Sequence, residues 1–338
     1  MRARAAHLTA ARLAATTAAF VLVLLVTIVA ATLLGPVHVS LARALGPGGA
    51  GTPDFAILLR TRLPRVLLAA VVGGSLATAG AALQGLLGNP LACPHLLGIS
   101  AGAAFGGVLA LLAGADTLSP VVPMAAFLGA LAAIAIVSVG ARAGGRTTPH
   151  AILLVGVVLN AVAAAALMLV NALASYLQAQ GVLFWIMGSL STQSYSLVGA
   201  SAAYSAAGLG WLVRHAQDLN LMAAGEEGAL QLGVDVERAR RMVFLASSLL
   251  VGAAVSVSGM IGFVGLIVPH LLRLVLGPDH RLLLPASFLG GAAFLVWADA
   301  LARTVFGPAE LPVGVVTALG GGPFFIYLLR RDLRRVMS

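Results

Sequence analysis

The chain has 338 residues, of which 60% are hydrophobic and only 9% charged, and its mean hydropathy is +1.03. A globular protein carries about a quarter charged residues, so most of this surface cannot face water. The composition excludes a disordered chain, a secreted disulfide-rich domain and a cytosolic enzyme, and it indicates an integral membrane protein.

The basic and thiol residues restrict the chemistry further. All 20 basic side chains are arginines, whereas a phosphate-binding P-loop or a Schiff-base site needs a lysine. The single cysteine, Cys93, can form neither an intrachain disulfide nor a multi-thiolate metal site. We therefore expect no catalytic residue, no metal site and no bound cofactor in this chain. The net charge of +9 is interpreted as a topology signal, not as a nucleic-acid footprint.

The apolar segments predict an all-α membrane protein, because a bilayer core about 30 Å thick needs about 20 apolar residues per helix. The first segment follows Arg2, Arg4 and Arg12, which also suits a signal peptide, but its apolar run is long and no clear cleavage site follows. The eighth segment contains Pro269 and is short for a straight crossing. Ten spans are predicted, at residues 14–34, 64–86, 96–113, 121–140, 150–173, 195–213, 242–260, 262–276, 282–302 and 311–329.

Glycine and alanine recur within these spans, in stretches such as Gly73-Gly74-Ser75 and Ser100-Ala101-Gly102. Lipid tails are as apolar as leucine, so membrane helices associate by the close backbone approach that small residues allow. We expect these stretches to be helix contact faces. The alternative is that glycine-interrupted helices expose backbone along a transport pathway.

The arginines orient the chain. Ten spans that start inside leave fifteen arginines on the cytoplasmic side and five outside, in agreement with the positive-inside rule. This predicts cytoplasmic tails at 1–13 and 330–338 around a transmembrane domain at 14–329. The five outer arginines are Arg43, Arg60, Arg62, Arg65 and Arg303.

Four of these outer arginines flank two spans. Arg60, Arg62 and Arg65 lie at the outer end of the second span, and Arg303 ends the ninth. They could extend to lipid headgroups, with Arg303 pairing with Asp299 four residues earlier. They could instead bind acidic groups of an external partner, because the planar guanidinium binds carboxylates with two hydrogen bonds. The residues alone do not choose between these two interpretations.

Residues 214–241 form a polar interruption on the predicted cytoplasmic side. The pattern predicts two short helices joined by a glycine, with Asp218 as a possible N-cap and Gly233 as a C-terminal stop. A solvated linker is the alternative. A linker has no need of leucines such as Leu221 and Leu232, so we favour a segment that lies in a groove of a soluble partner.

Seven motifs in order over residues 55–330 resemble the permease subunits of bacterial ABC importers for ferric siderophores, haem and vitamin B12, the type II ABC importers. Any one motif is a weak signal, whereas the ordered set is specific. The motifs lie at residues 62–65, 84–92, 97–102, 185–189, 225–226 with 232–233, 262–270 and 310–317.

The resemblance implies a homodimer of ten-helix subunits like the vitamin B12 importer permease, with the pathway on the dimer axis. It implies that Arg62, Arg65 and Arg303 receive acidic residues of a periplasmic substrate-binding protein. Gate positions implied on the cytoplasmic side are Asn89, Leu91, Thr147 and Thr148, with His95 beside them as a departure from the family pattern. The implied coupling residues, which enter the ATPase groove, are Leu221, Gly225, Glu226, Ala229, Leu232 and Gly233.

The expected function is therefore the permease subunit of an ATP-driven importer in the bacterial inner membrane, embedded in lipid and worked by two separate ATPase subunits that bind ATP and Mg²⁺. Haem is the favoured cargo, with ferric siderophore or cobalamin as alternatives. An ion-coupled secondary transporter is the competing class, but it needs ionisable residues near mid-membrane. The spans hold Asp299 near an outer end and little else. A membrane-embedded enzyme would need clustered His, Cys or carboxylates, which the spans lack.

Overall fold

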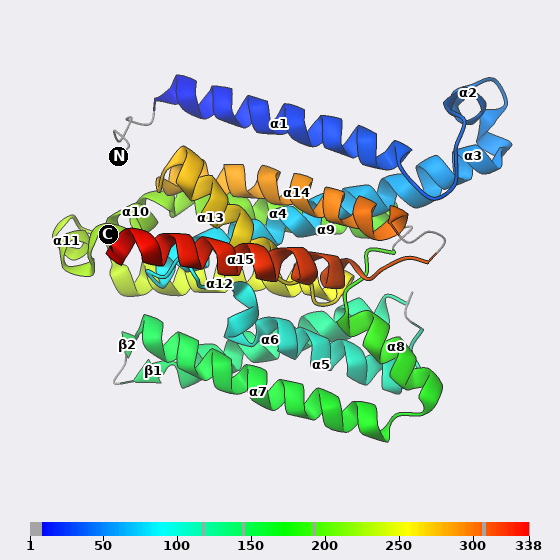
Figure 1. Ribbon diagram of the computed structural model, residues 1–338. Helices are drawn as coiled ribbons and strands as arrows, with labels where there is room; N and C mark the ends of the chain where they lie inside the picture. Colours follow the sequence, from blue (N-terminus) through cyan, green and yellow to red (C-terminus); the bar gives the residue numbers. More distant parts are fainter. Residues whose placement is uncertain (1–8, 117–118, 144–145, 192–193, 306–308, 338) are drawn as a thin grey trace.

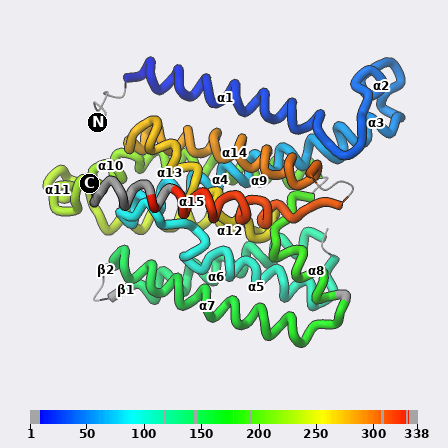
Figure 2. The backbone as a smooth tube through the Cα atoms, in the orientation of Figure 1, coloured from blue at the N-terminus to red at the C-terminus, as the bar shows by residue number. Residues whose placement is uncertain are grey.

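The computed structural model describes residues 9–116, 119–143, 146–191, 194–305 and 309–337. It is a bundle of helices that run side by side along one long direction (Figures 1 and 2). Within the described ranges, seven helices are long and apolar enough to cross a membrane, and three shorter apolar helices accompany them. These ten helices coincide with the ten predicted spans, so the predicted fold class is confirmed.

The long apolar helices are α1 (Ala10–Leu33), α4 (Leu63–Leu86), α6 (Val121–Gly140), α7 (Pro149–Leu173), α9 (Tyr195–Arg214), α12 (Val236–Ser258) and α14 (His280–Thr304). The shorter apolar helices are α5 (Ile99–Leu112), α13 (Val264–Leu276) and α15 (Val313–Met337). The α15 helix is apolar only over Val313–Tyr327.

Short elements connect these helices. A π-helical stretch, η2 (Ala56–Arg62), leads directly into α4. A two-residue antiparallel hairpin pairs β1 (Arg142–Ala143) with β2 (Arg146–Thr147), Arg142 opposite Thr147. The other short helices are α2 (Leu41–Leu45), η1 (Gly49–Gly51), α3 (Pro53–Phe55), η3 (Pro94–Leu97), α8 (Tyr176–Ile186), α10 (Ala216–Ala224) and α11 (Glu226–Gln231).

One predicted start was wrong, and two helices run into the predicted tails, because helices extend past the apolar runs that marked them. The α12 helix begins at Val236, not at residue 242, since the Asp235 carboxylate accepts a hydrogen bond from the backbone N–H of Arg238 at 3.0 Å and caps the helix. The first helix begins at Ala10 inside the predicted tail 1–13, of which residues 1–8 lie outside the described ranges. The predicted tail 330–338 is helical as far as Met337.

Helix α4 lies at the centre of the bundle. In the continuous helix Pro53–Leu86, which contains α4, 89% of the residues in an apolar 18-residue stretch are buried, against 6% for α1 at the periphery. A Cβ atom at Gly80 would stand 1.8 Å from the carbonyl oxygen of Gly265 in α13, and one at Gly73 would stand 2.3 Å from that of Gly291 in α14. Only glycine permits these approaches, so the prediction that small residues form contact faces is confirmed for α4.

The two ends of the bundle differ in the short elements that lie there. The start of α1, the β1–β2 hairpin, α10, α11 and the end of α15 lie at one end, and α2, α3 and α8 lie at the other (Figure 1). We call them the α11 end and the α3 end. The first long helix therefore starts, and the last one ends, at the same end of the bundle as α10 and α11 (Figure 1).

Candidate functional site

The segment after α9 folds into two short helices at the α11 end, as predicted. Gly225 joins α10 to α11 with a φ of 136°, and Gly233 follows α11 with a φ of 85°, both in the range that favours glycine. The expectation that Asp218 caps α10 was wrong. The helix begins earlier, at Ala216, and the Asp218 carboxylate instead lies 2.8 Å from Nδ1 of His215.

The two short helices present a mixed apolar and acidic surface. Leu232 is 70% exposed and Leu230 is 53% exposed, and Glu226 and Glu227 lie beside them in α11. Leu230 was not among the predicted coupling residues. It is part of this surface because its side chain in the short helix α11 is exposed. Gly225, Glu226, Leu232 and Gly233 are exposed as a partner-binding role requires.

Two of the six predicted coupling residues face the bundle. Ala229 is fully buried in the main hydrophobic core, and Leu221 packs against that core. The expectation that Ala229 contacts the partner directly was wrong, since a buried methyl group cannot enter the groove of another protein, whereas Leu221 is half buried and stays a predicted contact. Both residues instead fix α10 and α11 against the membrane helices.

Helix α10 is tied to the start of α14 through Asn220. Its amide nitrogen donates to Oδ1 of Asp279 at 2.8 Å, and its amide oxygen accepts from the backbone N–H of His280 at 2.8 Å. Hydrogen bonds from Arg281 to the Asp279 carboxylate, more than the bond from Asn220, lower the pKa of Asp279 to about 2. A movement of α10 must therefore be shared with α14 or break these bonds.

The predicted gate residues lie in the segment between α4 and α5 and in the turn before α7. Asn89 Oδ1 accepts from the backbone N–H of Leu91 at 2.9 Å, which makes a tight turn after α4 and leaves Leu91 exposed. Thr148 is exposed and caps α7, accepting from the N–H of Ala151 at 3.2 Å. His95 is exposed in η3.

Thr147, another predicted gate position, is held inside the subunit. It is buried, its backbone N–H donates to Oε1 of Glu237 at 3.1 Å, and its carbonyl oxygen accepts from Arg240 at 2.7 Å. Thr147 thus anchors the β1–β2 hairpin to α12, and its place at the gate stays a prediction. The sequence carried no signal for this contact, because Arg240 was interpreted only as one of the cytoplasmic arginines.

The three arginines expected to dock an external protein are buried at the α3 end. Arg65 Nε donates to Oδ1 of Asp299 at 2.9 Å, and Arg303 Nε donates to Oδ2 of the same carboxylate at 2.9 Å. Arg65 Nη1 also donates to Glu310 at 2.7 Å. We call Arg65, Asp299, Arg303 and Glu310 the Asp299 cluster. The predicted pairing of Arg303 with Asp299 is confirmed.

Arg62 is likewise held inside the subunit. It donates to the carbonyl oxygens of Leu33 at 3.0 Å and Val37 at 2.5 Å, near the end of α1. Since Arg62 and Arg303 are almost fully buried, they support the α3 end from within and are not themselves its solvent-facing charges. Arg43 and Arg60 are the exposed arginines in this region of the described chain.

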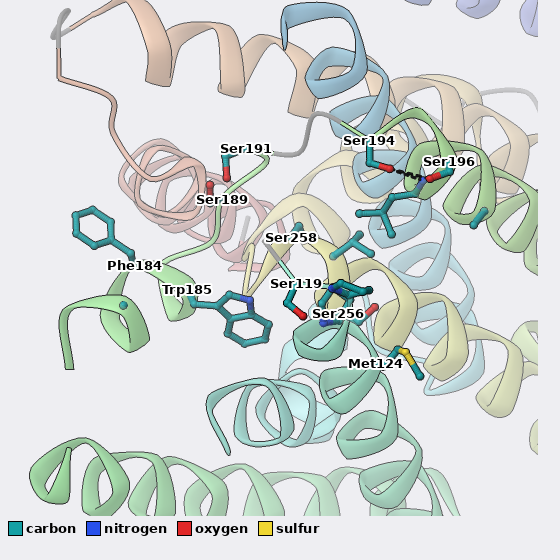
Figure 3. A pocket seen from close by; sticks show the side chains of 16 residues that line it. Ser119, Met124, Phe184, Trp185, Ser189, Ser191, Ser194, Ser196, Ser256 and Ser258 are labelled. Carbon is teal, nitrogen blue, oxygen red and sulfur yellow. Dashed lines mark hydrogen bonds between the residues drawn. The ribbon is translucent and has the colours of Figure 1, made fainter. Parts of the chain in front are cut away.

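A cavity of about 970 Å³ opens at the α3 end, between the start of α6, the end of α8, the start of α9 and the end of α12 (Figure 3). Its lining has no ionisable side chain and is rich in serine, together with Met124, Phe184 and Trp185. The lining serines are Ser119, Ser189, Ser191, Ser194, Ser196, Ser256 and Ser258.

Close backbone contacts fix the wall of this cavity. A Cβ at Gly259 would stand 2.1 Å from the Trp185 carbonyl oxygen, and one at Gly314 would stand 2.3 Å from that of Met187. The Trp185 ring lies against Gly107 of α5, where a Cβ would be 2.7 Å away. Two of the sequence motifs, 185–189 and 310–317, thus meet at one place. Their glycines are explained by packing.

No group of three or more His, Cys, Asp or Glu side chains suited to hold a metal ion occurs among the described residues. The cavity lining therefore offers hydroxyl groups and apolar surface to a passing molecule, with no side chain of fixed charge. Such a lining favours weak contacts, which allow a large solute to leave as well as enter.

Comparisons with known proteins agree with this architecture. Residues 22–331 match the FecCD transport family. The chain is 45% identical to the cobalamin import system permease protein of Halobacterium salinarum, over 84% of this chain and 77% of that protein. It is also 45% identical to the hemin transport system permease protein of Yersinia pestis, over 82% and 84%. A solved structure described as an inward-facing metal-chelate type ABC transporter superposes with a TM-score of 0.82 at 30% identity, covering 94% of this chain and 99% of that one.

Proposed function

Because the chain belongs to the FecCD transport family, we propose that it is the permease subunit of an ATP-driven importer that moves a metal-chelate-type compound into the cytoplasm. It is a multi-pass membrane protein and a transport component. We place it in the inner membrane with the α11 end and both termini in the cytoplasm. Hydrolysis of ATP takes place on separate ATPase subunits, and this chain itself holds no cofactor.

One observation carries the proposal: an apolar bundle projects two short helices with exposed leucines and glutamates at one end. Leu230, Leu232, Glu226 and Glu227 form a surface too polar for lipid and too apolar for a plain linker. A groove on a soluble ATPase would cover the leucines, while Asn220 and the buried Ala229 hold α10 and α11 against the membrane helices.

The partners follow from the family and from the exposed surfaces. Two copies of the chain would pair around the pathway and bind two ATPase subunits. Helix α7 carries an exposed apolar face suited to lipid or to the second copy, with Leu154, Val158, Val162 and Leu169 more than half exposed. At the α3 end, a periplasmic binding protein would meet Arg60 and Arg43, with Arg62, Arg65 and Arg303 supporting that surface from beneath.

Haem is the cargo proposed, with cobalamin and ferric siderophores as the alternatives to be tested. The names of the relatives include cobalamin, hemin and Fe(3+) dicitrate permeases and favour no single cargo. The cavity suits this class, because hydroxyl groups and aromatic rings contact a large, partly apolar chelate without binding it tightly.

The test is uptake by proteoliposomes that contain the purified chain alone, with its ATPase, or with both the ATPase and the binding protein. Uptake of one of the three chelates should require ATP and all the components. Uptake by the chain alone, driven by a proton or sodium gradient, would show a secondary transporter and overturn the proposal.

A further inference from the structure

Arg240 is a charged residue in an unusual place. It lies in the second turn of α12 and is 5% exposed, whereas its neighbours Arg238 and Arg241 on the same helix are exposed. Burying a guanidinium group is costly unless its hydrogen bonds are satisfied by well-placed partners. The contacts of Arg240 therefore indicate what that burial is for.

The Arg240 guanidinium joins three segments that are distant in the sequence. Nη1 donates to the carbonyl oxygen of Thr147 in β2 at 2.7 Å and lies 3.4 Å from Oε2 of Glu237 in α12. Nη2 donates to the carboxylate of Glu226, the first residue of α11. The other oxygen of Glu237 accepts from the Thr147 N–H at 3.1 Å. We call Arg240, Glu226, Glu237 and Thr147 the Arg240 cluster.

The cluster connects the segment that would meet the ATPase with the start of a membrane helix. Thr147 ends β2, and α7 begins two residues later at Pro149. The side chain of Glu226 is 50% exposed while that of Arg240 is 6% exposed, so the carboxylate is at the surface and the guanidinium is fixed inside. One buried group therefore contacts both α11 and β2.

We infer that Arg240 is the positioning residue that transmits movement of α11 to the β1–β2 hairpin and to the start of α7. The inference rests on the proposed function, because it assumes that an ATPase moves α11. The guanidinium suits this role because it has separate nitrogens for Glu226 and for Thr147, in a rigid plane. A lysine keeps the positive charge but has one nitrogen on a flexible stem.

The experiment compares Arg240→Lys with Arg238→Lys and Arg241→Lys in the full complex with ATPase and binding protein in proteoliposomes. The two controls make the same chemical change at exposed positions of the same helix. ATP hydrolysis should continue in all three variants. In Arg240→Lys alone, the uptake per ATP hydrolysed should fall by roughly 5- to 150-fold, the range of a coupling free energy between two sites.

A structural readout separates coupling from a simple loss of activity. Cys93 is the single cysteine, so Cys93→Ser provides a cysteine-free background for a spin label at His150→Cys, an exposed position at the start of α7. The distance between labels in the two subunits should change on addition of ATP in the parent protein and in the Arg238→Lys control. It should stay constant in Arg240→Lys.

A second variant covers the case in which Arg240→Lys folds poorly. Glu226→Ala removes the partner from the exposed side of the same contact and should reproduce the loss of uptake per ATP. The two changes should not add when combined, because they break one interaction. If the loss of uptake per ATP in the double variant equals the product of the two single losses, the two residues act independently. Glu226 is then a direct ATPase contact only, and the inference is overturned.

Failure of the inference differs from failure of the proposed function. If uptake per ATP hydrolysed in Arg240→Lys equals that in its two controls, Arg240 has only a structural role and the inference is wrong. If the parent protein shows no ATP-driven uptake and no ATP-dependent change in distance, the proposed function is wrong, and the inference falls with it.

Discussion

Two charged clusters occupy opposite ends of the bundle, and they differ in how deeply their carboxylates are buried. In the Asp299 cluster the acceptor Asp299 is fully buried between two arginines. In the Arg240 cluster the cation is buried, whereas the carboxylates of Glu226 and Glu237 are 50% and 33% exposed. Glu310 in the first cluster is also 47% exposed, so only the Asp299 centre of that cluster is closed within the subunit, whereas both carboxylates of the second cluster reach the surface.

This difference indicates what each cluster can do. A buried carboxylate that loses a partner leaves an uncompensated charge, so the Asp299 cluster resists rearrangement and stabilises the packing of α4 against α14. The half-exposed carboxylates of the Arg240 cluster lie where a partner at the α11 end can act on them, while the guanidinium stays fixed inside. The Arg240 cluster is therefore placed to pass on a movement, while the Asp299 cluster holds the opposite end fixed.

The largest expected effect is on stability at the α3 end. Replacing Asp299 with alanine leaves Arg65 and Arg303 buried without their shared acceptor, and the free energy of unfolding should fall by about 3–5 kcal/mol. Thermal unfolding of the purified protein in detergent measures the change. The matched control is Glu310→Ala, whose half-exposed carboxylate should cost at most about 1 kcal/mol. Equal losses in the two variants would mean that Asp299 is not the closed centre of the cluster.

The next effect is on coupling at the α11 end. Glu226→Arg places a second cation beside Arg240 and repels the segment that would meet the ATPase. Uptake per ATP should fall roughly 5- to 150-fold, and the free energy of unfolding should also fall, because the buried Arg240 loses a carboxylate acceptor. Uptake and ATP hydrolysis are measured together in proteoliposomes. Normal coupling in this variant would return the α10–α11 segment to the role of a solvated linker.

A smaller effect is expected from the exposed arginines of the α3 end. Arg60→Glu should weaken binding of the periplasmic protein and reduce its salt dependence, with thermal stability unchanged, because Arg60 lies at the surface. Arg62→Glu should destabilise the protein itself, because Arg62 binds carbonyl oxygens near the end of α1. Binding titrations at two salt concentrations, together with melting curves, distinguish the two. Unchanged binding in Arg60→Glu would remove this surface from the docking site.

The smallest expected effect is on thermal stability at acid pH. The folded-state pKa of Asp279 is about 2, below its ordinary value of 3.8, so its carboxylate stabilises the folded protein above pH 3.8 and loses that contribution as the pH falls through about 2. The melting temperature of the parent should therefore exceed that of Asp279→Asn at neutral pH, and the difference between the two should shrink as the pH falls through that acid range. Melting curves at several pH values measure it. A difference independent of pH would show that Asp279 acts only as a helix cap.

The sequence predicted the spans well because a membrane helix leaves a simple signal of length and hydropathy. The α6 boundaries, residues 121–140, were predicted to the residue. The start of α12 was missed because its first two turns contain Arg238 and Arg240, which lie beyond the apolar run although the Asp235 cap starts the helix before them. A hydropathy window cannot detect a helix that continues out of the apolar region.

The site was harder to predict because its contacts join distant parts of the chain. Arg62, Arg65 and Arg303 were recognised as exceptional, yet their burial depends on Asp299 and on the end of α1. Arg240 carried no local signal at all, since Thr147 and Glu226 approach it only in the folded protein. The α10–α11 pair was predicted correctly because its glycines and leucines mark it locally.

The side of the membrane on which α11 lies decides whether an ATPase can work this bundle. Leu232→Cys in the Cys93→Ser background gives one exposed thiol on this surface. A membrane-impermeant thiol reagent should modify this cysteine in inside-out membrane vesicles but not in intact cells. Bound ATPase should protect the cysteine from modification. Modification in intact right-side-out cells would place α11 outside and contradict the proposed mechanism.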